Sequence, residues 1–489
     1  MQLLRGALIV DGVLSPAWTG DLLFDASGIL EIGPDLSGRV GSHVPVRDCQ
    51  GLALAPGFID VHTHDDAALL LDPAMRPKLS QGVTTVVVGN CGISLVPLRL
   101  APDQALPPPL NLLPAEAYSY AHFADYRAAL EAAQPAVNVL ALVGHTALRA
   151  ACMPELDRPA QPNEMAAMCA LLDQALAEGA GGLSSGTFYA PAAAAPPEEL
   201  LALARVAARH SGRIYATHLR DEMAGVLAAI EEAADTAHQA GLPLQISHHK
   251  CAGHRQWGRA IETLALIERL AQRQDLGLDV YPYLAGSTVL REDLADGHTP
   301  IRLTWSEPHP ERSGQWLAEV ASEWGVSERE ACRRLQPGGA CYFQMCEDDV
   351  DRILAHPLAM IGSDGLPHDR QPHPRLWGAF PRVLAHYSRE RGLLSLERAV
   401  HKMSGQSAAR FGLLHERGQL RPGAAADLLL FDPAAVQDLA DYGEPCRPAR
   451  GIEAVWVNGR LALEAGVERA HAGRVLSPCA SLAAGAGSS

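Results

Sequence analysis

Eight short apolar runs recur through the middle of the chain, separated by longer stretches rich in alanine and leucine that have the spacing of helices. This alternation is typical of strand and helix units repeated around a parallel sheet. Eight such units predict an α/β fold, a (β/α)8 TIM-like barrel, whose active site lies at the C-terminal ends of the strands. The expected strands cover residues 57–62, 84–88, 137–143, 181–185, 214–218, 244–248, 278–283 and 359–363.

The two flanks of the chain do not follow this rhythm. Residues 1–54 and about 418–475 read as short strands joined by turns such as Val10-Asp11-Gly12 and Val457-Asn458-Gly459. We expect them to pack together as one small β-sandwich domain beside a barrel built from residues 55–417. The tail at 476–489 is rich in alanine, glycine and serine, and is predicted to be disordered.

Two further predictions concern single elements. Residues 221–240 form a helical pattern that Gly241 closes as a C-cap. The interval of about 286–347 is too long for a simple connection after the seventh strand, and the capping-box pattern Ser327-Glu328-Arg329-Glu330 starts a helix within it. An insertion at this face of a barrel is expected to act as a lid or a substrate-binding segment.

The charge balance and the cysteines bear on partners and location. The 489 residues include 40 Lys and Arg against 56 Asp and Glu, a net charge of -16 that disfavours nucleic acid and anionic membrane surfaces as partners. The first residues lack the long apolar region of a signal peptide, and the chain has no run of about 18 apolar residues. Ten cysteines without a CxxC pair suit free thiols, so the expected location is the cytoplasm.

Residues that bind metals stand at the ends of the predicted strands. His62 and His64 are two positions apart in a strand, so their imidazoles point to the same face. Later strands also end in imidazole, thiol or carboxylate groups, which together are ligands for Zn2+, with Fe2+, Mn2+ or Co2+ as alternatives. The candidate metal ligands are His62, His64, Cys91, His218, His248 and Asp364.

Each of these residues also has an ordinary interpretation. A histidine pair is often polar lining at a strand mouth, Cys91 in its Gly-rich turn is a small residue, and Asp364 before Gly365 suits a helix N-cap. The convergence of all six on one opening favours a metal-dependent hydrolase. A catalytically silent scaffold that keeps the barrel for binding would be expected to have lost ligands.

Several motifs resemble the D-aminoacylases, the N-acyl-D-amino-acid deacylases of the amidohydrolase superfamily, over nearly the whole chain. The Asn-Cys-Gly turn and the Ser-His-His-Lys run narrow the resemblance to this branch. The matching segments are Ala55-Pro56-Gly57-Phe58-Ile59-Asp60-Val61-His62-Thr63-His64-Asp65, Gly89-Asn90-Cys91-Gly92, Gly182-Leu183-Ser184-Ser185-Gly186, Thr217-His218-Leu219-Arg220-Asp221-Glu222, Ser247-His248-His249-Lys250, Asp279-Val280-Tyr281-Pro282-Tyr283, Gly362-Ser363-Asp364-Gly365 and His373-Pro374-Arg375-Leu376-Trp377-Gly378.

The resemblance implies a zinc site. A tightly bound Zn2+ would be held by Cys91, His218 and His248, and a second, weaker metal position by His62, His64 and Asp364. Many amidohydrolases bridge two metals with a carboxylated lysine on strand four, but here that strand reads Gly-Leu-Ser-Ser-Gly. Cys91 would then take the bridging role, and a stoichiometry of one or two metals stays open.

The resemblance also implies the reaction, hydrolysis of the amide bond of N-acyl-D-amino acids. Zinc activates water for attack on a carbonyl, and Asp364 would accept a proton and return it to the leaving amine. Lys250, Tyr281 and Arg375 match positions that bind the substrate α-carboxylate. An arginine after a Pro-rich loop is otherwise a surface residue, and Tyr281 could fill the barrel.

The side-chain preference is less constrained by sequence. We expect neutral, hydrophobic D-residues, whereas family members that take N-acyl-D-Glu or N-acyl-D-Asp use an extra basic residue, a part that Arg291 could play. Glu292 and Asp293 beside it favour a surface ion pair equally. Dipeptides with a D-residue and cyclic amides are also candidate substrates, although Lys250 with Arg375 favours a free carboxylate over a cyclic imide.

Overall fold

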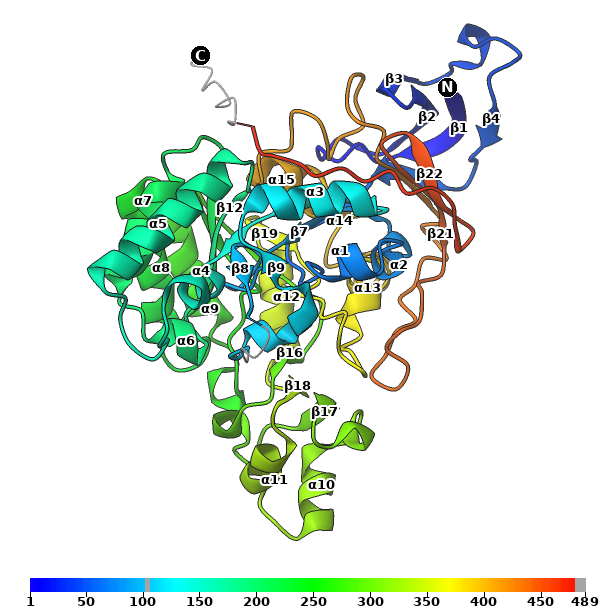
Figure 1. Ribbon diagram of the computed structural model, residues 1–489. Coiled ribbons are helices and arrows are strands. Elements are labelled where there is room, and N and C mark those ends of the chain that lie inside the picture. The colour runs from blue at the N-terminus through cyan, green and yellow to red at the C-terminus, as the bar shows by residue number, and fades with distance from the viewer. Residues whose placement is uncertain (102–105, 480–489) are drawn as a thin grey trace.

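The computed structural model describes residues 1–101 and 106–479, and it confirms the barrel (Figure 1). Strands pair in parallel in the order β6-β7-β10 and β11-β12-β13-β14-β15-β19, and a parallel bridge between Thr63 and Gly365 joins the first strand to the last. All eight predicted strands are present, the third as two short pieces. They are β6 (Phe58–Asp60), β7 (Val83–Val88), β10 (Asn138–Ala141) with β11 (Val143–Gly144), β12 (Gly182–Gly186), β13 (Ile214–His218), β14 (Leu244–Ile246), β15 (Leu276–Val280) and β19 (Ala359–Ile361).

The barrel strands are apolar because helices cover their outer faces. Strand β7 reads Val-Thr-Thr-Val-Val-Val, and every one of its residues is buried. Parallel strands buried on both faces read as continuous apolar runs rather than alternating ones. The covering helices are α1 (Ala68–Leu71), α2 (Arg76–Leu79), α3 (Phe123–Ala133), α4 (His145–Cys152), α5 (Pro162–Ala177), α6 (Ala190–Ala193), α7 (Pro197–Ala207), α8 (Val226–Ala240), α9 (Ala260–Ala271), α12 (Glu347–Ala355), α13 (Arg375–Arg382), α14 (Leu396–Met403) and α15 (Gly405–Arg410).

The predicted helix over 221–240 starts later than expected. Helix α8 begins at Val226, because the Asp221 carboxylate accepts the backbone N–H groups of Met223 and Gly225 and holds a turn instead. Its end agrees with the prediction, since Gly241 caps the helix with φ of 70°. The shift leaves Glu222 in a loop at the barrel mouth.

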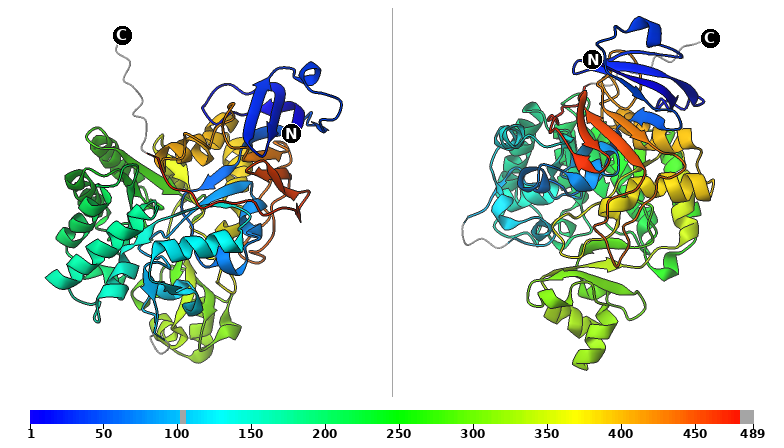
Figure 2. Two further views of the ribbon diagram at one scale, coloured as in Figure 1. Left: turned by 45° about the horizontal axis from the view of Figure 1, so that its top comes forward. Right: turned by 90° about the vertical axis from the view of Figure 1, so that its right-hand side faces the viewer.

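The two flanks form one nine-stranded sheet, so the chain pairs its beginning with its end (Figure 2). Strand β5 lies between β1, with which it is parallel, and β20, with which it is antiparallel. Asn458 and Gly459 both have positive φ in the tight turn between β21 and β22, as a two-residue hairpin requires. The strands are β1 (Gln2–Ile9), β2 (Trp18–Asp25), β3 (Gly28–Gly33), β4 (Val46–Asp48), β5 (Ala53–Pro56), β20 (Leu428–Phe431), β21 (Ile452–Val457), β22 (Arg460–Glu464) and β23 (Val467–Glu468).

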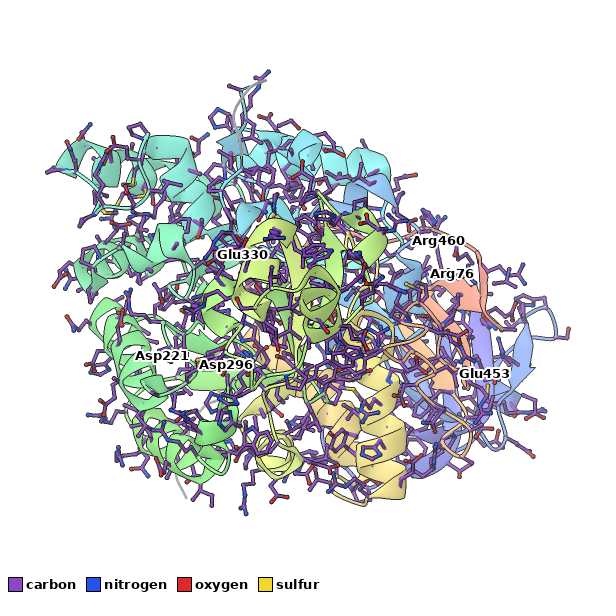
Figure 3. All side chains as sticks on the ribbon, turned by 90° about the horizontal axis from the view of Figure 1, so that it is seen from below. Arg76, Asp221, Asp296, Glu330, Glu453 and Arg460 are labelled. Carbon is purple, nitrogen blue, oxygen red and sulfur yellow. The ribbon has the colours of Figure 1, made fainter. Side chains whose placement is uncertain are left out.

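The segment after β15 is a small unit with its own apolar core, projecting from the barrel. Its antiparallel sheet has the order β16-β18-β17, and Ser327 caps α11 by accepting the Glu330 N–H. Figure 3 views the molecule from this side, with Glu330 and Asp296 of the insertion in front of the barrel. Its elements are β16 (Gly286–Val289), β17 (Ile301–Ser306), α10 (Leu317–Trp324), α11 (Glu328–Leu335) and β18 (Gly338–Tyr342).

Residues 476–479 of the predicted tail are fixed against the barrel. The Leu476 N–H donates to the Val139 carbonyl, and the Leu476 side chain is buried. The remainder of the tail, 480–489, lies outside the described residues. Within the described ranges, no helix combines the length and apolar character needed to cross a bilayer.

Candidate active site

All six predicted ligands meet at the C-terminal ends of the barrel strands, where they are buried. The Cys91 Sγ lies 3.2 Å from the His62 Nε2 and 3.3 Å from the His248 Nε2. The Asp364 Oδ1 lies 3.2 Å from the His64 Nε2. Three overlapping groups each place their donor atoms within 4.8 Å of one another: His62, His64 and Cys91; Cys91, His218 and His248; His62, His248 and Asp364.

Three of these ligands adopt left-handed backbone conformations. The φ angles of Cys91, His248 and Asp364 are 54°, 33° and 49°. Such angles are uncommon outside glycine and persist where the surroundings hold them. The Asp364 N–H donates to the His62 carbonyl and the His248 N–H to the Asp279 carboxylate, so hydrogen bonds fix two of the three.

The titratable groups of the predicted ligands shift one another's pKa values. Burial raises the pKa of the Cys91 thiol, but His62 and His248 more than offset this and hold the pKa well below its ordinary value. Burial also raises the pKa of Asp364, yet Arg375 and His248 keep it well below the usual range. Low pKa values favour the thiolate of Cys91 and the carboxylate of Asp364, the forms that bind Zn2+. Burial lowers the pKa of His64, but Asp364 and Cys91 more than offset it and raise the pKa to about 9, so a metal ion would displace a proton from this imidazole.

His218 gives a further test of the fit to a metal. Its side chain is buried, yet neither ring nitrogen makes a hydrogen bond within the described residues, although the Glu222 carboxylate lies 3.4 Å from Nε2. A buried imidazole without a hydrogen bond is costly unless another ligand completes it. Together with a thiolate and further imidazoles, it makes a donor set that fits zinc.

Two carboxylates that the sequence did not single out support these ligands. The Asp279 Oδ1 lies 3.2 Å from the His62 Nδ1, and the Glu222 Oε1 lies 3.1 Å from the His248 Nδ1. A carboxylate behind a histidine fixes the ring and its tautomer and makes the other nitrogen a better ligand. Asp279 and Glu222 both lie in sequence motifs near strand ends. An acidic residue close to a strand end is the sequence feature from which their role could have been predicted.

Arg375 and Tyr281 lie together beside the metal ligands. Arg375 is fully buried, and its Nη1 lies 2.9 Å from the Asp364 Oδ2. Its Nη2 donates to the Ser287 carbonyl at 3.0 Å, and its guanidinium lies 4.6 Å from the centre of the Tyr281 ring. The hydroxyls of Tyr281 and Ser287 are buried and make no hydrogen bond within the described residues. This corner therefore offers a cation and two free hydroxyl donors, the groups that bind a carboxylate.

A family model matches most of the chain. It is described as "Amidohydrolase family" and covers residues 45–286 and 319–462. The chain belongs to the amidohydrolase family.

Individual relatives of this amidohydrolase are also close. It is 52% identical to a D-aminoacylase of Alcaligenes xylosoxydans xylosoxydans, covering 97% of both chains. It is 50% identical to an N-acyl-D-aspartate deacylase of the same organism, covering 97% of this chain and 95% of the relative.

Two solved structures match with similar coverage. A D-aminoacylase with a binuclear metal centre gives a TM-score of 0.94 at 50% identity, over 97% of this chain and 99% of the other. An N-acyl-D-glutamate deacylase from Bordetella bronchiseptica, complexed with zinc and a phosphonate inhibitor, gives 0.92 at 45% identity over the same shares. Both agree with a barrel and a β-sandwich domain in this amidohydrolase.

The last two predicted substrate residues occupy different surroundings. Lys250 lines the cavity of the amidohydrolase, with its Nζ 2.6 Å from the Glu222 Oε1 and 2.9 Å from the His248 Nδ1. Arg291 lies outside the cavity lining, where it pairs with Asp293 through two contacts of 2.9 and 2.6 Å and covers the outer face of Phe188. The structure thus has the ion pair that the sequence left open for Arg291.

Proposed function

We propose that the chain hydrolyses the amide bond of N-acyl-D-amino acids, giving a carboxylate and a free D-amino acid, with Zn2+ as cofactor. Two relatives at 52% and 50% identity, named as a D-aminoacylase and an N-acyl-D-aspartate deacylase, support this assignment. The metal donor set supports it from the chemical side. Cys91, His218 and His248 would hold the tight zinc, and His62, His64 and Asp364 the weaker position.

The protein's own groups would handle protons and orientation. Bound zinc supplies a Lewis acid that polarises the amide carbonyl and lowers the pKa of water. Asp364 is an ionised carboxylate, so it can accept a proton and later return it to the amine that leaves. Its contact with Arg375 holds the carboxylate toward the histidines.

The strongest support for this function is the set of unpaired hydrogen-bond donors next to the metal ligands. The buried hydroxyls of Tyr281 and Ser287 and the Nε of Arg375 make no hydrogen bond within the described residues. Tyr281 and Ser287 line the cavity, so a substrate α-carboxylate placed there would accept from both hydroxyls, with the fully buried Arg375 beside Tyr281 as the nearby positive charge. Lys250 adds a positive charge on the same cavity wall.

For the side chain we propose neutral, hydrophobic D-residues. Beyond the polar groups, the cavity is lined by apolar and aromatic residues: Leu112, Phe188, Tyr189, Leu294, Tyr342 and Leu366. Asp293 neutralises Arg291 through an ion pair. The Phe188 ring lies between Arg291 and His218, because Arg291 covers it and its centroid stacks 4.8 Å from that of the His218 ring. N-acyl-D-Asp and N-acyl-D-Glu are the second candidate class, which the named relatives favour.

The insertion after β15 also contributes to the cavity. Ser287, Leu294 and Tyr342 of residues 286–347 line the cavity, which supports a substrate-binding or lid role for this segment.

All ten cysteines lie in the described part of the chain and are free thiols, which suits the reducing cytoplasm.

Ninhydrin detection of free amino acid tests the proposed reaction. The zinc-loaded protein is incubated with N-acetyl-D and N-acetyl-L forms of leucine, methionine, aspartate and glutamate. Release from the D series alone, fastest with leucine and methionine, is the expected result. Fastest release from the acidic pair would assign the second class, and no release from either series would contradict the deacylase proposal and direct the assay to D-dipeptides and cyclic amides.

A further inference from the structure

A buried lysine stands behind one half of the metal cluster. Lys78 of α2 is 0% exposed, and its Nζ lies 2.8 Å from the Asp60 Oδ2, 3.0 Å from the Thr63 Oγ1 and 2.9 Å from the Ser363 Oγ. The Asp65 Oδ2 is 3.2 Å away. An ammonium group has three hydrogens to donate, and this one meets three acceptors and a second carboxylate.

The partners of Lys78 belong to the two segments that carry His62, His64 and Asp364. Asp60 lies two residues before His62, Thr63 lies between the two histidines, and Ser363 directly precedes Asp364. The same network joins these segments to each other. The Asp60 Oδ1 accepts the N–H of Ser363 at 2.8 Å, and the Ser363 hydroxyl donates to the Asp60 Oδ2 at 2.6 Å.

The remaining ligands rest mainly on other side chains, although Asp279 contacts both halves of the cluster: its Oδ1 accepts the His248 N–H and lies 3.2 Å from the His62 Nδ1. Cys91, His218 and His248 come from the ends of β7, β13 and β14, and Glu222 and Asp279 make the contacts to the two histidines. Within the described residues, the hydrogen bonds and ion pairs of Lys78 include none of these five side chains. A change at Lys78 therefore disturbs one half of the cluster directly.

We propose that Lys78 is a positioning residue for the second metal position: it fixes His62, His64 and Asp364 as one unit and leaves the affinity of the Cys91, His218 and His248 position unchanged. The inference rests on the proposed function in one respect, the assumption that His62, His64 and Asp364 together bind a metal ion. Partners behind metal ligands typically change metal affinity by about 10- to 100-fold when they are removed.

The test is zinc binding by the full-length protein dialysed against buffers of graded free Zn2+, with zinc per chain measured by atomic absorption. We expect two binding steps in the wild type. In Lys78→Met the step at lower free zinc stays in place, and the step at higher free zinc moves upward by at least about tenfold. Because no substrate is used, the result is independent of the deacylase assay.

Two further variants make the outcome decisive. Lys402 is also a 0% exposed lysine on the barrel, bonded to the carbonyls of His356 and Ala359, so Lys402→Met is a matched control that should keep both zinc steps. The double variant K78M/D60N removes the buried charge pair together and avoids the unpaired Asp60 carboxylate that could prevent folding. A single zinc step in the wild type, an unmoved second step in either folded Lys78 variant, or an equal shift in Lys402→Met would overturn the proposal.

Discussion

At the scale of single residues, the sequence predicted the groups that we propose to touch a metal or substrate, and it missed those that act through other side chains. His62, Cys91 and Asp364 could be predicted because each follows an apolar strand that the barrel buries. Lys78 could not, since a lysine in a four-residue helix reads as a surface residue until its depth is known. Glu222 was hidden by the mistaken start of the helix after β13.

Cys91 offers a direct test of the metal site. We expect Cys91→Ala to lose zinc at chelator concentrations that the wild type withstands, and to lose at least about 100-fold in kcat, because the thiolate touches both halves of the cluster. Zinc content after dialysis and the rate of N-acetyl-D-leucine hydrolysis measure the two effects. Full activity together with wild-type zinc content would rule out Cys91 as a ligand.

Asp293 controls the charge available beside the cavity. The Arg291–Asp293 pair is partly exposed, and such a pair is worth about 1 kcal/mol, which corresponds to about fivefold in a rate ratio. We expect Asp293→Asn to raise kcat/KM for N-acetyl-D-glutamate by about that factor and to leave N-acetyl-D-leucine unchanged. Equal changes for both substrates would show that Arg291 takes no part in discrimination.

At the scale of elements, buried charge joins two neighbouring helices of the barrel. Glu199 of α7 lies 2.9 Å from the His145 Nε2 and 2.5 Å from the Arg149 Nη1 of α4. Burial raises the pKa of Glu199, but these two contacts more than offset it and lower the pKa to about 2. The sequence predicted helical stretches between the strands, but not this pair, because the pairing depends on how the two helices pack.

The pH dependence of stability follows from that pKa. A carboxyl with a depressed pKa in the folded state stabilises fully above its unfolded pKa of about 4.5, and the contribution disappears as the pH falls toward 2. The shift corresponds to about 3 kcal/mol. Glu199→Gln should therefore lower the free energy of unfolding at pH 7 and flatten its decline between pH 5 and pH 2, as measured by urea unfolding. Parallel declines in variant and wild type would contradict this role.

At the scale of the whole molecule, one polar network ties the β domain to the barrel. The Asn138 Nδ2 of β10 donates to the Asp427 Oδ2 at 2.9 Å, and the Asn458 Nδ2 donates to the Asn138 Oδ1 at 2.7 Å. Arg417 pairs with Asp427 in the same buried site. The sequence predicted that the flanks meet each other, but the docking depends on side chains whose partners lie hundreds of positions away.

This network predicts that the barrel and the β domain unfold together. Asp427→Ala removes the buried ion-pair partner of Arg417 and leaves it the exposed Glu416 carboxylate at 3.6 Å. Breaking a buried pair costs about 3–5 kcal/mol. We expect one cooperative thermal transition in the wild type and a lower one in the variant, measured by calorimetry. Two separate transitions in the wild type would show that the network does not couple the domains.

The pairing of β5 with β20 also sets an order of events at the ribosome. Strand β5 ends at Pro56, yet the strand that covers its second edge begins at Leu428, so the whole barrel is synthesised while that edge is open. An open strand edge invites pairing with another chain. The nascent protein therefore carries an open strand edge, prone to aggregation, while its barrel is emerging, and the β domain can close only after β20 has been synthesised.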